Sequence, residues 1–339
     1  MSVKSMLRVV GAYLDAKFRG RCRPLAAYYN VTFQCNLRCS FCSNWRTRMS
    51  ELGGGEALKA VKNICEYGVP ALGFSGGEPL LRRDIYSLAS LAKDYGLTTS
   101  INTNGTLVDE WTAKKLAKTF DYVIVSIDGF PATHDSMRGV TGTQAKAVRA
   151  VEHLSKAGAN VGVNTVIHPA NLSEIPHLWL SLSSHVKYYS TQPVNPPPIG
   201  FEADGVRRLI RVLIQLWRRR LLALDVPELY MHGIPLYVAG AAPKICDAGK
   251  LYFALQPDGE IIPCSPGPDM TPASLGNILK TPLNEALNRE ANPEVWRRVE
   301  ACSGCWLTCT TAISIYNKHP MEAVKRYLEL SFATRTPRK

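Results

Sequence analysis

Short apolar segments alternate with amphipathic stretches of helical period from residue 26 to residue 190 of this 339-residue chain. Strand-like segments span Ala26–Phe33, Pro70–Phe74, Thr98–Thr103, Tyr122–Ile127, Asn160–Ile167 and Val186–Ser190. Helices are predicted between them, over Glu56–Tyr67, Arg83–Tyr95, Glu110–Thr119, Thr143–Ala157 and Leu172–Leu182. Such alternation favours a parallel sheet joined by right-handed crossovers. Because several segments are apolar without interruption, the sheet should be covered on both faces. We therefore predict an α/β fold built on a partial (β/α)6 TIM-type barrel.

Polar or glycine-rich clusters follow the predicted strands. Ser75–Pro79 follows the second strand, Asn102–Gly105 the third and Ser126–Gly129 the fourth, and the fifth strand carries Asn164. Each cluster alone could be an ordinary turn, because Gly, Asn and Asp favour turns. The carboxyl ends of parallel strands meet at one end of a barrel, so the recurrence of these clusters predicts one shared site there.

The ten cysteines are grouped. Three lie in the string CNLRCSFC after the first strand, at Cys35, Cys39 and Cys42. Five more lie late in the chain, at Cys246, Cys264, Cys302, Cys305 and Cys309. Cys22 and Cys65 stand apart, and we interpret both as structural thiols. The chain lacks a secretory signal and any run of about 18 apolar residues. We therefore expect a reducing, cytoplasmic compartment, in which grouped cysteines indicate metal before disulfides.

The early triplet can supply three thiolates from one loop. A cubane iron–sulfur cluster usually takes four cysteines, so three ligands leave one iron open. An open metal position is typical of a catalytic site, whereas structural sites are closed. Phe41, directly before the last cysteine of the triplet, could shield the cluster or a bound ring.

The triplet, the GGEPL string at Gly76–Leu80, the NTNG and SIDG strand ends and the segment His134–Gly142 together resemble the radical S-adenosylmethionine (SAM) superfamily. The resemblance covers roughly residues 25–190. It implies that Cys35, Cys39 and Cys42 hold a 4Fe–4S cluster whose open iron chelates SAM. Reductive cleavage of SAM would then yield a 5′-deoxyadenosyl radical that abstracts hydrogen from an unactivated C–H bond. A low-potential electron donor of ferredoxin or flavodoxin type is implied as a partner.

The same resemblance implies positions around SAM. Its amino group would be received by Gly76, Gly77 and Glu78, because a carboxylate and nearby carbonyls accept from an ammonium and glycines let the backbone approach closely. Phe41 would approach the adenine. The remaining cofactor-binding residues are expected near the ribose and carboxylate or at the neighbouring strand end, and they are Asn104, Ser126, Asp128 and Asn164.

The late cysteines follow the pattern C-x12-G-x4-C and then C-x2-C-x3-C. Phe253–Pro263 between them predicts a hairpin with an Asp-Gly turn. A structural zinc site is one interpretation. The pattern also resembles the SPASM and twitch auxiliary-cluster regions of the same superfamily, which implies a small α+β domain with one auxiliary 4Fe–4S cluster. Cys246, Cys264 and Cys309 are its expected ligands, and Cys302 and Cys305 compete for the fourth place. The fifth cysteine would lie idle or ligate substrate.

The net charge of +12 is concentrated in two amphipathic segments, near the N-terminus and over Gly205–Leu224. Such segments can lie on an anionic membrane, or present a basic face above a protein core. The first alternative would place the protein on the inner face of the membrane. Nucleic acid is not expected as a partner, because no binding module for it is evident.

We predict four parts: a basic N-terminal segment (1–24), a radical SAM partial barrel (25–200), a basic helical linker (201–240) and a SPASM/twitch-like domain (241–339).

Three substrate classes remain open from the sequence. A peptide or protein side chain suits SPASM-type relatives, although only about 25 residues precede the barrel, so a peptide-recognition module would have to be a separate protein. A membrane lipid is suggested by the two basic segments. A tetrapyrrole side chain is suggested by related haem-pathway enzymes. A non-catalytic iron–sulfur protein is the remote alternative, because GGEPL and an open iron would then have no purpose.

Overall fold

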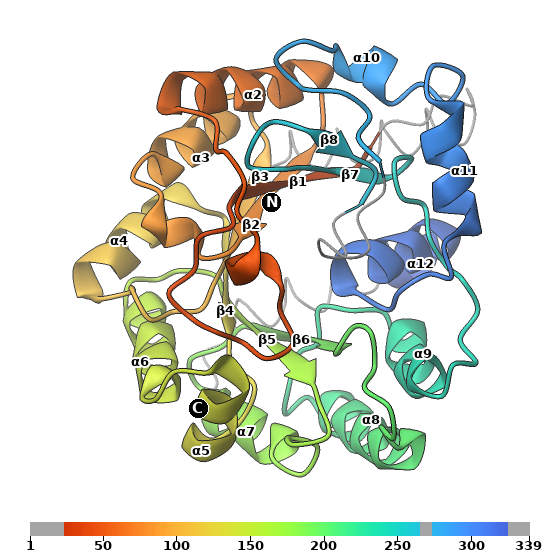
Figure 1. Ribbon diagram of the computed structural model, residues 1–339. Helices are drawn as coiled ribbons and strands as arrows, with labels where there is room; N and C mark the ends of the chain where they lie inside the picture. Colours follow the sequence, from red (N-terminus) through yellow and green to blue (C-terminus); the bar gives the residue numbers. More distant parts are fainter. Residues whose placement is uncertain (1–23, 265–272, 325–339) are drawn as a thin grey trace.

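A computed structural model describes residues 24–264 and 273–324 of the chain (Figure 1). One sheet in the order β6-β5-β4-β3-β2-β1-β7-β8 runs through it. Its strands are β1 (Ala26–Thr32), β2 (Ala71–Gly76), β3 (Thr98–Thr103), β4 (Tyr122–Ser126), β5 (Val161–Ile167), β6 (Tyr188–Pro193), β7 (Tyr252–Leu255) and β8 (Ile261–Ile262). Figure 1 shows helices arranged around the outside of this curved, open sheet. The expected partial α/β barrel is confirmed.

Strands β1 to β6 are parallel and pair in sequence order. The helices that join them are α2 (Gly54–Tyr67), α3 (Ile85–Asp94), α4 (Glu110–Thr119), α5 (Pro131–Arg138), α6 (Thr143–Lys156) and α7 (Ile175–Leu182). The strands bury β-branched side chains such as Val123 and Val125, and the helices bury one apolar face each. Hydrophobic periodicity therefore accounts for this part of the fold apart from α5.

The sheet is longer than the six strands expected, because β7 pairs in parallel with β1. The predicted hairpin is present, with Ala254 and Leu255 of β7 opposite Ile262 and Ile261 of β8. Its first strand joins the barrel sheet instead of standing in a separate layer. The pairing covers the hydrogen-bonding edge that β1 would otherwise leave free. It also brings the late cysteines toward the barrel's first strand.

Two local differences from the sequence prediction have plain physical reasons. Strand β6 continues to Pro193, three residues beyond the predicted end, and a proline is tolerated there because β6 is an edge strand. Helix α5 was not among the predicted helices. It is short and polar, and its buried residues are His134, Met137 and Arg138, so its apolar stripe is too weak to be recognised.

Helix α8 (Ala203–Arg218) corresponds to the second basic segment. Its apolar face is buried in the main core through Val206, Leu209, Ile210, Leu213 and Ile214. The helix packs against α7 and α9 (Glu228–Val238), while its arginines stay exposed. Helix α8 therefore presents a basic face above a protein core. Because its apolar face is already buried, α8 does not support binding to a membrane surface. The first basic segment lies outside the described residues. No described helix is both long and apolar enough to cross a membrane.

The chain after β8 contains α10 (Leu283–Ala286), α11 (Pro293–Ala301) and α12 (Ile313–Lys318), with a π-helical turn over Thr308–Ala312. It packs into the same hydrophobic core as the barrel. Trp306 stacks on Tyr230 of α9 at a centroid distance of 5.9 Å, and its indole N–H donates to the Tyr230 carbonyl at 2.9 Å. These contacts hold the C-x2-C-x3-C segment against the barrel.

Candidate functional site

A cavity of about 960 Å³ lies at the carboxyl ends of the barrel strands. Most of the residues that the sequence assigned to SAM and its cluster line it, namely Cys35, Cys39, Cys42, Phe41, Gly76, Gly77, Asn104, Ser126 and Asn164. They come from the ends of β1 to β4 and from within β5, so the fold brings together groups that lie more than a hundred residues apart in sequence. Glu78 and Asp128 are buried behind the cavity wall and do not line it.

The loop that carries the triplet is held at its start and in its middle by backbone contacts. At its start, the amides of Gly77 and Glu78 donate to the carbonyls of Thr32 (2.7 Å) and Gln34 (2.8 Å). A Cβ added at Gly77 would lie 2.1 Å from the Gln34 carbonyl oxygen, so only glycine fits this close approach. In the middle of the loop, the amides of Arg38 and Ser40 donate to the last carbonyls of α5, each at 3.0 Å.

Glu78 has a structural environment that the sequence prediction did not anticipate. Its fully buried carboxylate accepts from the Thr103 hydroxyl (2.8 Å), the Asn104 amide (2.8 Å) and the Leu80 amide (3.1 Å). Burial raises the pKa of this carboxyl, and the three hydrogen bonds oppose that shift. In this arrangement the carboxylate joins β2 to the end of β3 and is not presented to the cavity. In this structure Glu78 is therefore not placed to contact the amino group of SAM directly, although the sequence had led us to expect this contact.

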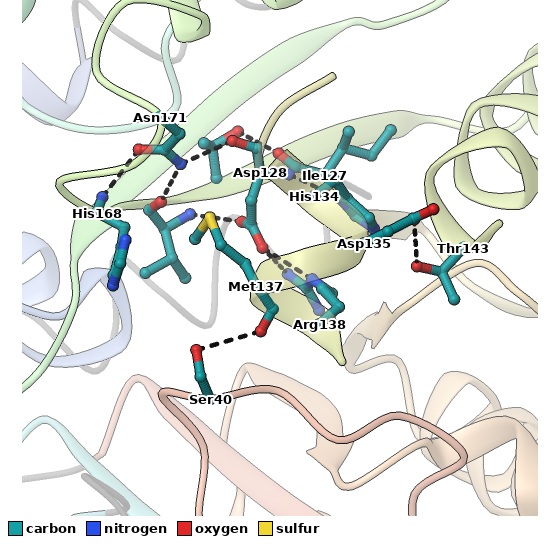
Figure 2. A network of polar contacts seen from close by, with 12 residues as sticks. Ser40, Ile127, Asp128, His134, Asp135, Met137, Arg138, Thr143, His168 and Asn171 are labelled. Carbon is teal, nitrogen blue, oxygen red and sulfur yellow. Dashed lines mark hydrogen bonds and ion pairs between the residues drawn. The ribbon is translucent and has the colours of Figure 1, made fainter. Parts of the chain in front are cut away.

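Asp128 forms a buried ion pair with Arg138 of α5, which Figure 2 shows from close by. The carboxylate contacts the guanidinium at 2.7 and 2.8 Å and also accepts from the Val166 amide at 2.9 Å. Its backbone amide donates to the imidazole Nδ1 of His134 at 3.1 Å. Burial, together with the charge of Arg138, lowers the pKa of His134 to about 4, which keeps the imidazole neutral. Asp128 thus fixes α5 against the sheet. We had expected its side chain beside the ribose of SAM, but it points away from the cavity instead.

Arg138 is the residue that the sequence reasoning missed. Its guanidinium carbon lies 5.7 Å from the centre of the Phe41 ring, and the residue lines the cavity beside the triplet. Burial raises the pKa of the Cys39 thiol to about 11, whereas the charge of Arg138 opposes this shift. The signal for it was the segment His134–Gly142, which contains Arg138, although the strand-end pattern pointed only to Asp128.

The donor chemistry of this loop fits a 4Fe–4S cluster with one open iron. It offers three thiols and one neighbouring cation, and the Leu37 amide points to the Cys35 sulfur at 3.4 Å. Amide hydrogen bonds to cysteine sulfur and nearby positive charge both stabilise an anionic iron–sulfur cluster. Among the described residues, no three His, Cys, Asp or Glu side chains are arranged around a single metal-ion position.

The late cysteines gather beside β7. Burial raises the pKa of the Cys264 thiol, and each of the other four late cysteines raises it further, which places these four near Cys264. Cys302 is exposed and accepts from the Gly304 amide at 3.4 Å, while Cys305 is half-buried, 3.2 Å from the Thr310 hydroxyl. Cys309 differs from the other four because it lines the central cavity. Tyr252 of β7 also lines the cavity, and its hydroxyl lies 3.3 Å from the Cys246 sulfur.

Comparison with known protein families gives two matches. The radical SAM superfamily model matches residues 29–178, and the SPASM iron–sulfur cluster-binding domain model matches residues 246–306. Together they span more than half of the chain. The second match contains Cys246, Cys264, Cys302 and Cys305 and ends before Cys309.

Several curated proteins are similar in sequence. The Fe-coproporphyrin III synthase of Methanosarcina barkeri is 36% identical over 44% of this chain and 39% of its own length. The AdoMet-dependent heme synthase of the same organism is 29% identical over 81% of this chain and 84% of its own length. A PqqA peptide cyclase of Rhodopseudomonas palustris is 28% identical over 82% of this chain and 74% of its own length. The chain thus spans only about two fifths of the first two curated relatives that it matches.

Among solved structures, native anSMEcpe with bound AdoMet has the same fold, with a TM-score of 0.65 at 18% identity over 92% of this chain and 99% of that one. The two family models, the relatives and the fold agree with the three-cysteine loop and the late cysteine group. The cofactors are accordingly SAM, a 4Fe–4S cluster that binds it, and an auxiliary iron–sulfur cluster. The chain belongs to the radical SAM superfamily of enzymes and carries a C-terminal SPASM iron–sulfur cluster-binding domain.

Proposed function

We propose that this protein cleaves SAM reductively in the central cavity and uses the resulting radical to abstract hydrogen from an unactivated C–H bond of its substrate. The observation that supports this most directly is the convergence of three thiols, a Gly-Gly turn and polar strand ends on one cavity. When bound to the three thiolates, a reduced 4Fe–4S cluster supplies the electron that splits SAM into methionine and a 5′-deoxyadenosyl radical.

The residues of this chain bind and orient SAM. The backbone of Gly76 and Gly77 would approach its amino group, because neither residue places a side chain in the cavity. Asn104, Ser126 and Asn164 offer amide and hydroxyl groups along the wall for the ribose and carboxylate. Phe41, backed by Arg138, would lie against the adenine. Glu78 and Asp128 act behind this wall, where they hold the strand ends and α5 in place.

We propose a peptide side chain as the substrate. The cavity wall contributed by β6 and the late segment carries hydroxyl and amide groups, from Ser190, Gln192, Thr308 and Thr310, which suit peptide groups. The similarity to a PqqA peptide cyclase over most of both chains agrees with this class. A tetrapyrrole is the second candidate, because the two relatives from Methanosarcina barkeri are named for haem-pathway products. A lipid has less support, since the apolar face of α8 is buried.

The test is an anaerobic assay for 5′-deoxyadenosine, run with dithionite and the reconstituted protein. Separate reactions would contain a peptide extract, a coproporphyrin-type tetrapyrrole and a lipid extract. We expect release above the substrate-free level, with the peptide extract giving the largest increase. No 5′-deoxyadenosine in any reaction would contradict SAM cleavage, whereas stimulation by the tetrapyrrole alone would move the assignment to the second candidate.

The contacts of the late cysteines support one set of four ligands for the auxiliary cluster, where the sequence left the fourth ligand open. Cys302 and Cys305 each accept an amide hydrogen from the residue two positions further on, as Cys35 does in the triplet loop. Such bonds are common around cluster sulfurs. Cys309 instead faces the cavity. We therefore revise the expected set to Cys246, Cys264, Cys302 and Cys305, with Cys309 as a thiol that faces the substrate.

This ligand set predicts iron counts. With two 4Fe–4S clusters, the reconstituted wild-type protein should contain about eight irons per chain. Cys309→Ala should keep that number, whereas Cys302→Ala should lose most of the auxiliary cluster and fall to about four. Iron and sulfide analysis after anaerobic reconstitution measures both. Loss of iron in Cys309→Ala together with full loading of Cys302→Ala would reverse the assignment.

Tyr252→Phe is predicted to lower the reduction potential of the auxiliary cluster. The hydroxyl of this buried tyrosine can donate to the Cys246 thiolate, and a hydrogen bond to cluster sulfur favours the reduced, more negative state. The midpoint should shift to more negative values with no loss of iron. Tyr28→Phe is the matched control, because Tyr28 packs on the Tyr252 ring and lines the cavity. A redox titration followed by EPR would show the shift in the first variant only.

A further inference from the structure

A basic surface lies beside the triplet, on the same loop and the segment that follows it. It consists of Arg38, Trp45, Arg46 and Arg48, and we call it the cysteine-loop rim. Trp45 and Arg46 also line the central cavity, whereas Arg38 and Arg48 do not. All three arginines are exposed, and the Trp45 ring lies between two of them, 5.1 Å from the guanidinium of Arg38 and 4.6 Å from that of Arg46. Within the described part of the chain, no carboxylate pairs with any of the three. The segment between β1 and α2 that carries the rim runs across the front of the molecule in Figure 1.

The rim is joined to the triplet by direct hydrogen bonds. The indole N–H of Trp45 donates to the Cys39 carbonyl at 3.1 Å. The guanidinium of Arg38 donates to the carbonyls of Cys35 and Leu37, each at 2.8 Å. A partner that rests on Trp45 and Arg38 is therefore one side chain away from the backbone of Cys39 and of Cys35. The contacts also hold the aromatic ring and the arginine in place before any partner arrives, which lowers the entropic cost of binding.

We propose that the cysteine-loop rim is the docking surface for the protein that reduces the catalytic cluster, an acidic low-potential electron carrier of the flavodoxin or ferredoxin class. This inference rests on the proposed SAM cleavage, which requires such a reductant. One electron passes from the reduced carrier to the cluster, so that the carrier is oxidised by one electron, and no bond forms or breaks. Exposed arginines attract and orient an acidic carrier, and Trp and Arg are the residues most enriched at the centres of protein interfaces.

The surface elsewhere on the chain provides a matched comparison. Arg208 and Arg211 on α8 are also exposed and have no ion-pair partner within the described residues. Helix α8 packs on α7 and α9, and α9 lies beside β6, which four strands separate from β1, the strand that leads into the triplet loop. Reversing the charge of Arg208 changes the net charge of the protein by the same amount as reversing the charge of Arg48 in the rim. Long-range attraction alone would make the two variants behave alike.

The experiment compares Arg48→Glu with Arg208→Glu in the reconstituted protein, because Arg48 is the rim arginine that neither lines the cavity nor bonds to the triplet loop. SAM cleavage is driven either by dithionite or by a reduced carrier, with flavodoxin and ferredoxin in separate reactions. We expect the rim variant to raise the KM for the carrier on the order of tenfold at low salt and less at high salt. Its dithionite-driven rate should stay at the wild-type value, and the α8 variant should change little in either reaction.

Three results would overturn the docking surface: an unchanged carrier KM in the rim variant, an equal rise in the α8 variant, or an equal loss of the dithionite-driven rate. The last result would mean that Arg48 acts on the cluster or on SAM instead of on the carrier. Failure of the proposed function is distinguishable, because the wild-type protein would then release no 5′-deoxyadenosine even with dithionite.

Discussion

Replacing Cys35, Cys39 and Cys42 by alanine is expected to abolish SAM cleavage. All three thiols lie on one loop at the cavity, and each would bind a different iron of the proposed three-cysteine 4Fe–4S cluster, so no remaining ligand could substitute. Release of 5′-deoxyadenosine with dithionite should fall to the protein-free background. The iron content should fall to that of the auxiliary cluster alone, about four per chain.

Cys65→Ala is the control for this loss. Cys65 is buried at 3% exposure in α2, within the hydrophobic core and away from the cavity lining. Its replacement should keep the full iron content and the cleavage activity, with a modest loss of stability from the smaller side chain. Cleavage that persists in the triple variant at the rate of the Cys65 variant would refute the assignment of the triplet.

Asp128→Ala is expected to destabilise the protein by about 3–5 kcal/mol, because it leaves the guanidinium of Arg138 buried without its partner. The variant also removes the acceptor of the Val166 amide. The effect should extend to the triplet loop, since the last carbonyls of α5 accept from the amides of Arg38 and Ser40. Urea unfolding monitored by circular dichroism gives the free energy of unfolding, and iron loading of the triplet reports the loop.

Lys114→Ala is a matched control for Asp128→Ala, because it breaks an ion pair as well, with Glu110 on the surface of α4. An exposed pair contributes little to stability, so this variant should unfold close to the wild-type midpoint. Asp128→Asn should fall between the two, since it keeps a hydrogen-bond acceptor but not the charge. An Asp128→Ala variant as stable as Lys114→Ala would show that the buried pair does not hold α5 in place.

Much of the barrel follows from local patterns in the sequence. β3 and α4 coincide with their predicted ranges, Thr98–Thr103 and Glu110–Thr119, because each combines a clear hydrophobic period with turn residues at its ends. Prediction was weaker where a tertiary contact decided the outcome. Helix α5 has little apolar surface of its own and is stabilised by the buried pair between Asp128 and Arg138. Strand β7 is only four residues long and depends on pairing with β1.

The candidate site also has one part that sequence patterns predict and another that depends on tertiary contacts. The cysteine spacing and the strand-end clusters identified most of the cavity wall, because residues at the carboxyl ends of parallel strands must converge. The same pattern could not separate a strand-end residue that faces the cavity from one that faces inward. Glu78 and Asp128 lie at strand ends like Asn104 and Ser126, yet their side chains enter hydrogen-bond networks behind the wall. Which way a side chain points depends on partners that are distant in sequence.

The sequence by itself determined the fold class, the three-cysteine loop and the group of late cysteines, because hydrophobic period and cysteine spacing are local properties of the chain. Only the tertiary structure decided that the late hairpin extends the barrel sheet, that Cys309 faces the cavity and that Arg138 accompanies the triplet. It also decided that the apolar face of α8 belongs to the core. These features arise from contacts between segments far apart in the chain, where strand pairing, burial and ion pairing decide between arrangements that the local sequence leaves open.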